Sequence, residues 1–319
     1  MEKGKGENQT SLTEFILLEF RNLPGLQILF FLLFLMIYIV TMAANMLVVV
    51  LVVTDQHLHT PMYFFLGNLS CLATCYTSAI LPRMLATLLT GDRTVSVNGC
   101  ITQLYCFGFL AATECYILAA MSYGWYLAIS KPLHYAFRMN GRNCLWLAAG
   151  SWSSGFLGST VMTFLVSQLT FCGSNEIDHF FCDFTPVIQL SCSDTHLTTL
   201  VTLILSSIET LTPFLLTLMA YVCIIVTVLG IPSTRERQKA FSTCCLHLAV
   251  VTIFYGTIII VYVMPKNSML RELNKVFSVF YTILTPLAHL LIYSLRNKEI
   301  NEALRKATSK CMGPNSQQM

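Results

Sequence analysis

The stretch that decides the fold runs from Leu26 to Val53 and reads LQILFFLLFLMIYIVTMAANMLVVVLVV. It holds no charged residue, and it exceeds the roughly 20 apolar residues that a helix needs to cross a bilayer core of about 30 Å. The whole chain has the same character, because 55% of its 319 residues are hydrophobic and only 11% are charged. A typical soluble protein has about 25% charged residues. We therefore expect lipid to be the solvent for most of this chain.

Seven apolar segments of this kind follow one another, and short links between them carry most of the charge. They are expected at Leu26–Val53, Pro61–Leu89, Cys100–Ile129, Cys144–Leu165, Thr198–Leu229, Ala240–Met264 and Lys275–Tyr293. The composition excludes a disordered chain and a small secreted disulfide-rich domain. A net charge of +3 without a basic, aromatic-rich cluster excludes nucleic acid as a partner. The predicted fold is an all-α membrane protein, a seven-transmembrane helix bundle.

Charge and cysteine placement both favour an external N-terminus. Eleven of the 19 lysines and arginines then fall on the cytoplasmic side, as the positive-inside rule favours. Four cysteines fall on the other side, where disulfides persist: Cys100, Cys172, Cys182 and Cys192. Asn8, in the sequon Asn-Gln-Thr, is a glycosylation acceptor that requires a lumenal tail. The predicted divisions are an extracellular tail (1–25), a seven-transmembrane domain (26–293) and a cytoplasmic segment (294–319).

The long link between the fourth and fifth spans, residues 166–197, holds three of these cysteines together with histidine and aspartate. Such a cluster is also compatible with zinc in residue type. However, successive cysteines are separated by ten residues, which is not the CxxC spacing of a tetrahedral site. We therefore expect no metal. We expect two disulfides that fold this link into a lid over the bundle.

Ionisable groups at membrane depth are costly and usually face the bundle interior. This sequence has four: Glu114, Glu209, His247 and His289. They are compatible with a polar ligand site or with interhelical hydrogen bonds, and the sequence leaves both open. Their scatter over four spans disfavours a transporter or channel, and no paired halves of inverted topology are seen. No catalytic or cofactor motif occurs, so we expect no enzyme and no cofactor.

Small and large side chains recur at helical spacing in the outward half of three spans. These side chains are Phe107, Gly108, Ala111 and Ala112, then Leu205, Ser206 and Glu209, then Tyr255, Ile258, Ile259 and Tyr262. Small residues facing large apolar ones leave a space lined mainly by carbon. The pattern predicts either a cavity for a small lipophilic molecule or simply helix-packing surfaces.

Five motifs resemble those of odorant receptors, a branch of the rhodopsin-like G-protein-coupled receptors. They are Leu58-His59-Thr60-Pro61-Met62-Tyr63-Phe64-Phe65-Leu66, Pro132-Leu133-His134-Tyr135, Phe180-Phe181-Cys182-Asp183 followed by Leu190-Ser191-Cys192-Ser193-Asp194, Lys239-Ala240-Phe241-Ser242-Thr243-Cys244 and Tyr293-Ser294-Leu295-Arg296-Asn297-Lys298-Glu299. They stand in the family's order relative to the seven spans. The resemblance covers about residues 10–306.

The resemblance implies that Cys100 pairs with Cys182 and Cys172 with Cys192. It implies that Tyr255 senses a small hydrophobic odorant in the outward cavity. The partner implied is the heterotrimeric olfactory stimulatory G protein, which activates adenylyl cyclase and raises cyclic AMP. The same resemblance implies that the cytoplasmic segment 294–319 is a short amphipathic helix followed by a tail, and that the protein lies in the plasma membrane.

Three inner positions depart from the family pattern. The family's Asp-Arg-Tyr is replaced by Gly124-Trp125-Tyr126, its Asn-Pro by His289-Leu290, and its second-span aspartate by Ala73. Trp125 carries no charge, so it does not repeat the arginine's contacts.

Two interpretations of these departures remain open. One is a weakly coupling or non-signalling receptor, retained in the endoplasmic reticulum or acting through a receptor oligomer. The other is a receptor that switches through substituted contacts. The switch candidates are Trp125, Tyr126, Tyr221, His247 and Tyr293.

Overall fold

A computed structural model describes residues 12–18, 24–172, 174–262, 277–279, 282–283, 300, 302–303 and 305. Within the last long helix it leaves out the side chains of 236, 239–244, 246 and 262. The predicted glycosylation site at Asn8 and most of the predicted seventh span, Lys275–Tyr293, lie outside the described residues. So does most of the predicted amphipathic helix.

Six long helices occupy the first six predicted spans, which confirms the all-α membrane fold. They are α1 (Gln27–Thr54), α2 (Pro61–Thr90), α3 (Val97–Ser130), α5 (Gly141–Ser167), α7 (His196–Leu229) and α8 (Thr234–Tyr262). In the part of the chain that the structure describes, α1, α2, α3 and α7 are each long and apolar enough to cross a membrane. α5, with 27 residues, is slightly shorter than these and richer in glycine and serine.

Local sequence explains why several helices extend or stop where they do. α3 begins before the predicted Cys100 because the Ser96 side chain accepts a hydrogen bond from the amide of Gly99 at 3.1 Å, which caps the first turn. α2 ends at Gly91, whose φ of 76° is the left-handed conformation that glycine adopts without strain. α8 begins at Thr234, six residues before the predicted Ala240, so it projects beyond the apolar segment.

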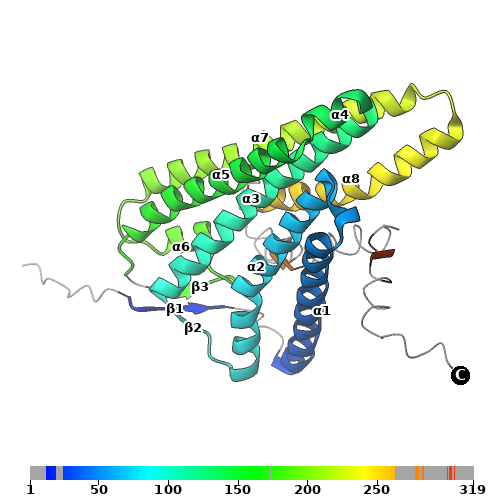
Figure 1. The fold of residues 1–319 in the computed structure, drawn as a ribbon. Coiled ribbons are helices and arrows are strands. Elements are labelled where there is room, and N and C mark those ends of the chain that lie inside the picture. The colour runs from blue at the N-terminus through cyan, green and yellow to red at the C-terminus, as the bar shows by residue number, and fades with distance from the viewer. Residues whose placement is uncertain are drawn as a thin grey trace, which may run out of the picture.

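α3 is the central helix of the bundle. Figure 1 shows α5 and α7 running alongside it, while α2 packs on its other side and α1 packs on α2. The burial of the helices reflects this order: 72% of the most apolar window of α3 is buried, against 22% of that of α1. The side chains around α3 therefore form the interior in which a site is expected.

Small side chains bring α5 close to α3. Ser151, Gly155 and Ser159 recur at four-residue intervals on one face of α5, the spacing that lets membrane helices approach each other closely. The hydroxyl of Ser159 donates a hydrogen bond to the carbonyl oxygen of Tyr105 at 2.9 Å. At Gly155 an added Cβ would lie 2.7 Å from the carbonyl oxygen of Phe109. The backbones of α5 and α3 are therefore in direct contact at this point.

The structure also contains a small sheet that was not predicted. Its order is β2-β1-β3, in which β1 (Glu14–Leu17) pairs antiparallel with β2 (Thr94–Ser96) and parallel with β3 (Glu176–Ile177). Phe15 and Leu17 of β1 are fully buried. A four-residue strand is too short to show a period in the sequence, and its partners lie far away along the chain. The sheet joins part of the predicted tail to two links at one end of the bundle.

Two short helices lie in the links. α4 (Pro132–Arg138) follows α3, and α6 (Phe184–Gln189) lies in the link before α7. Two single-turn 3-10 helices, Pro24–Leu26 and Gln56–Leu58, flank α1. α6 matters most for function, because it forms part of the lid described next.

A candidate ligand cavity beneath a disulfide-linked lid

The link before α7 covers one end of the bundle as a lid. Cys182 is joined to Cys100 at the start of α3, with a Cα–Cα distance of 5.4 Å. Cys172 is joined to Cys192 within the link, with a Cα–Cα distance of 5.8 Å. These pairings are those that the resemblance implied. They attach the lid to α3 and close a loop beside it.

Aromatic side chains insert from the lid into the bundle. Phe181 is fully buried, and its ring centroid lies 4.8 Å from that of Phe107 on α3. Phe184 of α6 rests against Gly108, where an added Cβ would lie 3.0 Å from its ring. Glycine at 108 therefore makes room for the lid rather than for a ligand alone.

Polar contacts hold the lid in place. The side-chain oxygen of Gln103 accepts a hydrogen bond from the amide of Cys182 at 2.9 Å, and its nitrogen donates to the carbonyl oxygen of Ala79 at 3.0 Å. One side chain on α3 therefore joins the lid to α2. On the far side, Nε2 of His179 lies 3.3 Å from the hydroxyl of Ser278.

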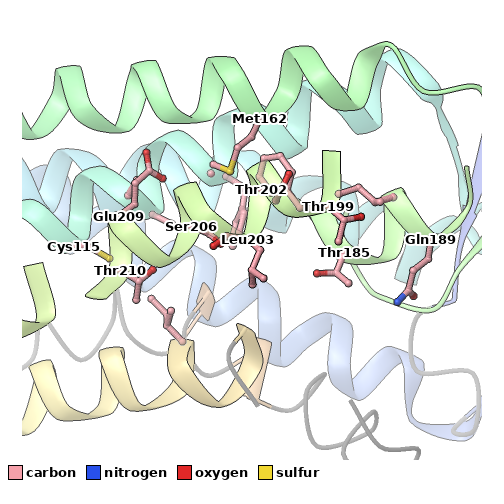
Figure 2. Close-up of a pocket in the computed structure, with 17 residues that line it drawn as sticks. Cys115, Met162, Thr185, Gln189, Thr199, Thr202, Leu203, Ser206, Glu209 and Thr210 are labelled. Atoms are coloured by element: carbon pink, nitrogen blue, oxygen red, sulfur yellow. The ribbon is translucent and has the colours of Figure 1, made fainter. Parts of the chain in front are cut away.

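A cavity of about 330 Å³ lies beneath this lid. Its volume is at the lower end of the range for small-molecule sites, about 300 to 1,000 Å³. Figure 2 shows how Thr199, Thr202, Ser206, Glu209 and Thr210 follow one another along α7 at its edge. The full lining is Phe107, Gly108, Ala111, Ala112, Cys115, Met162, Phe184, Thr185, Ile188, Gln189, Thr199, Thr202, Leu203, Ser206, Glu209, Thr210 and Ile258.

Seven of the eleven predicted ligand-site residues line the cavity. They are Phe107, Gly108, Ala111, Ala112, Ser206, Glu209 and Ile258. These faces border open space as well as neighbouring helices, and the binding of a ligand in that space stays a prediction.

The other four predicted residues do not line it. Leu205 instead packs against the apolar cluster beneath the sheet, because it lies about 100° around α7 from Ser206. Tyr255 is fully buried and donates its hydroxyl to the carbonyl oxygen of Cys115 at 2.9 Å. Ile259 does not border the cavity, and the side chain of Tyr262 lies outside the described residues.

Sequence reasoning missed the threonines of α7 and the contribution of α6. Thr199, Thr202 and Thr210 share one face with Ser206, at intervals of three and four residues, so helical periodicity contained this signal. By contrast, Thr185 and Gln189 reach the cavity only through the path of the lid. No local pattern predicts that path.

The cavity is lined mostly by carbon, with a few hydroxyl groups. The hydroxyl of Thr202 is buried, and among the described residues it has no hydrogen-bond partner. Glu209 is 8% exposed and its carboxylate lies against Gly158 of α5, where even a Cβ would collide with it. Glu114, also buried, does not line the cavity. A ligand there would meet mainly apolar surface, together with threonine side chains of which Thr202 has an unpartnered hydroxyl among the described residues.

Several predicted switch residues meet at the other end of the bundle. Trp125 and Tyr126 of α3 pack against a cluster that includes Tyr221 of α7. The hydroxyl of Tyr221 makes a hydrogen bond with Nδ1 of His247 on α8, and the two rings stack. Nε1 of Trp125 is buried without a partner among the residues described. Tyr293 and His289 fall outside the described part of the chain.

Comparison with known proteins shows similarity over nearly the whole chain. A profile of the family described as "Olfactory receptor" matches residues 34–310. Olfactory receptor 5AP2 of Mus musculus is 45% identical over 306 residues, which cover 95% of this chain and 96% of that protein. Olfactory receptor 6N1 of Homo sapiens is 48% identical over 299 residues, 94% of this chain and 96% of that protein. Olfactory receptor 11A1 of Homo sapiens is 48% identical over 299 residues, 94% of each. The matched region includes the lid, the cavity and the inner cluster.

Proposed function

This chain belongs to the olfactory receptor family, a family of multi-pass helical membrane proteins, and on that premise we propose that it is an odorant receptor of the plasma membrane. Its ligand is a small volatile organic molecule that enters the cavity beneath the lid. The observation that carries the proposal is that cavity, about 330 Å³ in volume and lined by residues of α3, α5, α6, α7 and α8. The function includes no catalytic step.

The lining indicates the class of ligand. An apolar molecule gains from leaving water, and the unpartnered hydroxyl of Thr202 at the cavity wall can donate a hydrogen bond to a single acceptor oxygen. A carbonyl, ester or ether oxygen at one end of a hydrocarbon fits this arrangement. Carbon walls discriminate by shape, so one methylene changes binding by only about 1 to 3 kcal/mol.

The proposed response is a shift of population. A ligand that contacts α3, α7 and α8 favours the conformation in which the inner ends of the fifth, sixth and seventh spans separate to admit the olfactory stimulatory G protein. Adenylyl cyclase then raises cyclic AMP. With the N-terminus outside, the lid and its disulfides face outward, and Lys131, Arg138 and Arg142 around α4 face the cytoplasm, which agrees with the positive-inside rule.

A second candidate is a family member that binds odorant without coupling to a G protein, retained inside the cell or acting by pairing with other receptors. It is favoured by Trp125, which stands where the family has arginine and packs into the cluster of Tyr221, Ile224 and Val228. An indole in that place joins α3 to α7 through apolar contact rather than through charge.

The test is cyclic AMP output in cells that express the full chain with an N-terminal epitope, exposed to a panel of volatiles. Ala112→Leu fills the cavity, and Ala149→Leu adds the same bulk on an exposed face of α5. We expect a response in the parent and in Ala149→Leu, and at least a tenfold higher half-maximal concentration for Ala112→Leu. Equal half-maximal concentrations for the two variants would refute the cavity as the ligand site.

The same assay separates the two candidates. Surface labelling of the epitope shows whether the chain reaches the cell surface. A silent parent at the surface, with a response in the Gly124→Asp, Trp125→Arg double variant, would favour the non-coupling receptor. An added Cβ at Gly124 meets only the flexible end of Met139, so the double variant is expected to fold.

A further inference from the structure

A second and larger hollow lies between the inner halves of α3, α5 and α7, apart from the ligand cavity. This hollow, the inner groove, has a volume of about 570 Å³. Three tyrosines and a tryptophan form much of its wall: Tyr116, Tyr123, Tyr126 and Trp146. Its floor includes Gly150, where an added Cβ would meet nothing within 4 Å. The groove is therefore open space and not a packing seam.

The inner groove opens toward lipid. Trp146, Leu216 and Met219 border it and are 68%, 54% and 65% exposed. Two of its three walls, α3 and α7, are helices long and apolar enough to cross a membrane. An open apolar groove at that depth is filled from the bilayer, so its natural occupant is an acyl chain.

Three cations surround the end of the groove beside α4. Arg138 donates a hydrogen bond through Nη1 to the hydroxyl of Tyr123 at 3.3 Å. Nζ of Lys131 lies 6.0 Å from the ring centroid of Tyr126. Arg142 precedes Trp146 by four residues on α5 and thus shares its face. Figure 1 shows α4 at this end of the bundle.

No acidic side chain of this region balances the three cations. The sequence from residue 115 to 175, which includes α4, α5 and the inner half of α3, contains no aspartate or glutamate. Within the described ranges, Lys131, Arg138 and Arg142 form no ion pair. Arg138 is fully exposed. The mouth of the groove therefore carries three cations that have no ion-pair partner among the described residues.

From this arrangement we propose that the inner groove is a binding site for one anionic phospholipid. An acyl chain occupies the groove along Tyr116, Tyr126 and Trp146, and the phosphate group lies between Arg138 and Lys131 at its mouth. Arginine and lysine both bind phosphate oxygens, arginine with two parallel donors. Basic residues next to a membrane span attract anionic lipid through charge, and the groove adds a fixed place for the chain.

The test measures lipid retained by the purified full chain, by native mass spectrometry after exchange from vesicles. The probes are dioleoylphosphatidylserine and dioleoylphosphatidylcholine, which share their acyl chains and differ in net charge. We expect selective retention of phosphatidylserine. Arg138→Gln is expected to weaken it about fivefold, since one cation near the surface contributes about 1 kcal/mol. Arg93→Gln, the same change beside β2 at the opposite end of the bundle, is the control.

A second pair of variants tests the groove itself. Gly150→Leu places a side chain in the open space and is expected to abolish most retention of phosphatidylserine without harming the fold. Ala149→Leu adds a leucine next to it, outside the groove lining, and is expected to retain lipid as the parent does.

Three results would overturn the proposal. The first is equal retention of the two lipids by the parent. The second is an equal effect of Arg138→Gln and Arg93→Gln, which would mean that only overall charge matters. The third is full selectivity in Gly150→Leu, which would place the acyl chain elsewhere.

Discussion

The close approach of α5 to α3 predicts a large difference between two identical substitutions on one helix. At Gly155 an added methyl group would lie 2.7 Å from the carbonyl oxygen of Phe109 and 3.0 Å from the amide nitrogen of Thr113. Both atoms are backbone, so neither can move without moving α3. At Gly150, on the same helix, an added methyl group meets nothing within 4 Å.

The magnitude follows from two terms. Replacing glycine by alanine inside a helix favours the helix by about 1 kcal/mol, and this gain applies at both positions. Overpacking costs about 1 to 3 kcal/mol and applies only at Gly155. The propensity gain cancels in the comparison, so Gly155→Ala should be less stable than Gly150→Ala by about 1 to 3 kcal/mol.

The assay is thermal unfolding of the purified chain in one detergent, followed for parent and both variants at one heating rate. At about 2 °C per kcal/mol for a chain of this size, the two melting temperatures should differ by about 2 to 6 °C. Gly150→Ala should equal or exceed the parent. If Gly155→Ala melts with or above Gly150→Ala, the backbone contact between α3 and α5 is not present as described.

Other predictions concern the lid and its surroundings. Gln103→Leu removes the two hydrogen bonds that its side chain makes to Cys182 of the lid and to Ala79 of α2, so the chain should lose about 1 to 3 kcal/mol in the same thermal assay, and an unchanged melting temperature would contradict the role of that side chain. Cys182→Ser opens a loop of 82 residues and Cys192→Ser one of 20, so the first should destabilise more, by about 4.5 against about 3.3 kcal/mol as upper limits. If Cys192→Ser were the more destabilising variant, this would contradict the view that a disulfide stabilises the fold mainly by restricting the unfolded chain. Hydrogen bonds from the amide and hydroxyl of Thr94 lower the pKa of Asp92, so its stabilisation of this turn is present above the unfolded pKa and is lost as pH falls through the folded one. Lowering the pH should therefore accelerate amide hydrogen exchange in residues 91–96 more in the parent than in an Asp92→Asn variant. The same pH dependence of exchange in parent and variant would refute this role of Asp92.

Much of the candidate site was predictable because helices repeat. Spacing placed Ala111, Ser206 and Ile258 on the inward faces of their helices, since residues three or four apart share a face, and the family resemblance implied a cavity there. The same rule wrongly places Leu205 at the cavity, one residue before Ser206. Periodicity shows which residues share a face of a helix, but it does not fix the rotation of the helix about its axis. Packing against neighbours decides that rotation.

The links and strands were less predictable because their contacts are with residues far away along the chain. Phe15 of β1 is buried against residues far along the chain, and α6 reaches the cavity only because Cys182 is attached to α3. No short window of sequence contains either partner. The two-residue strand β3 has no pattern of its own.

The solvent, the fold class and the family follow from the amino-acid sequence alone. Long uncharged runs such as Leu26–Val53 have no stable place in water, and the link motifs are specific enough to indicate olfactory receptors. Only the tertiary structure decided which faces meet: that Gly155 lets α5 touch α3, that the lid reaches the cavity, and that Arg138 stands at the mouth of an open groove. The physical reason is how far apart along the chain the residues that cause each effect lie. Hydrophobicity acts residue by residue along the chain, whereas a cavity exists only where side chains from several helices fail to fill the space between them.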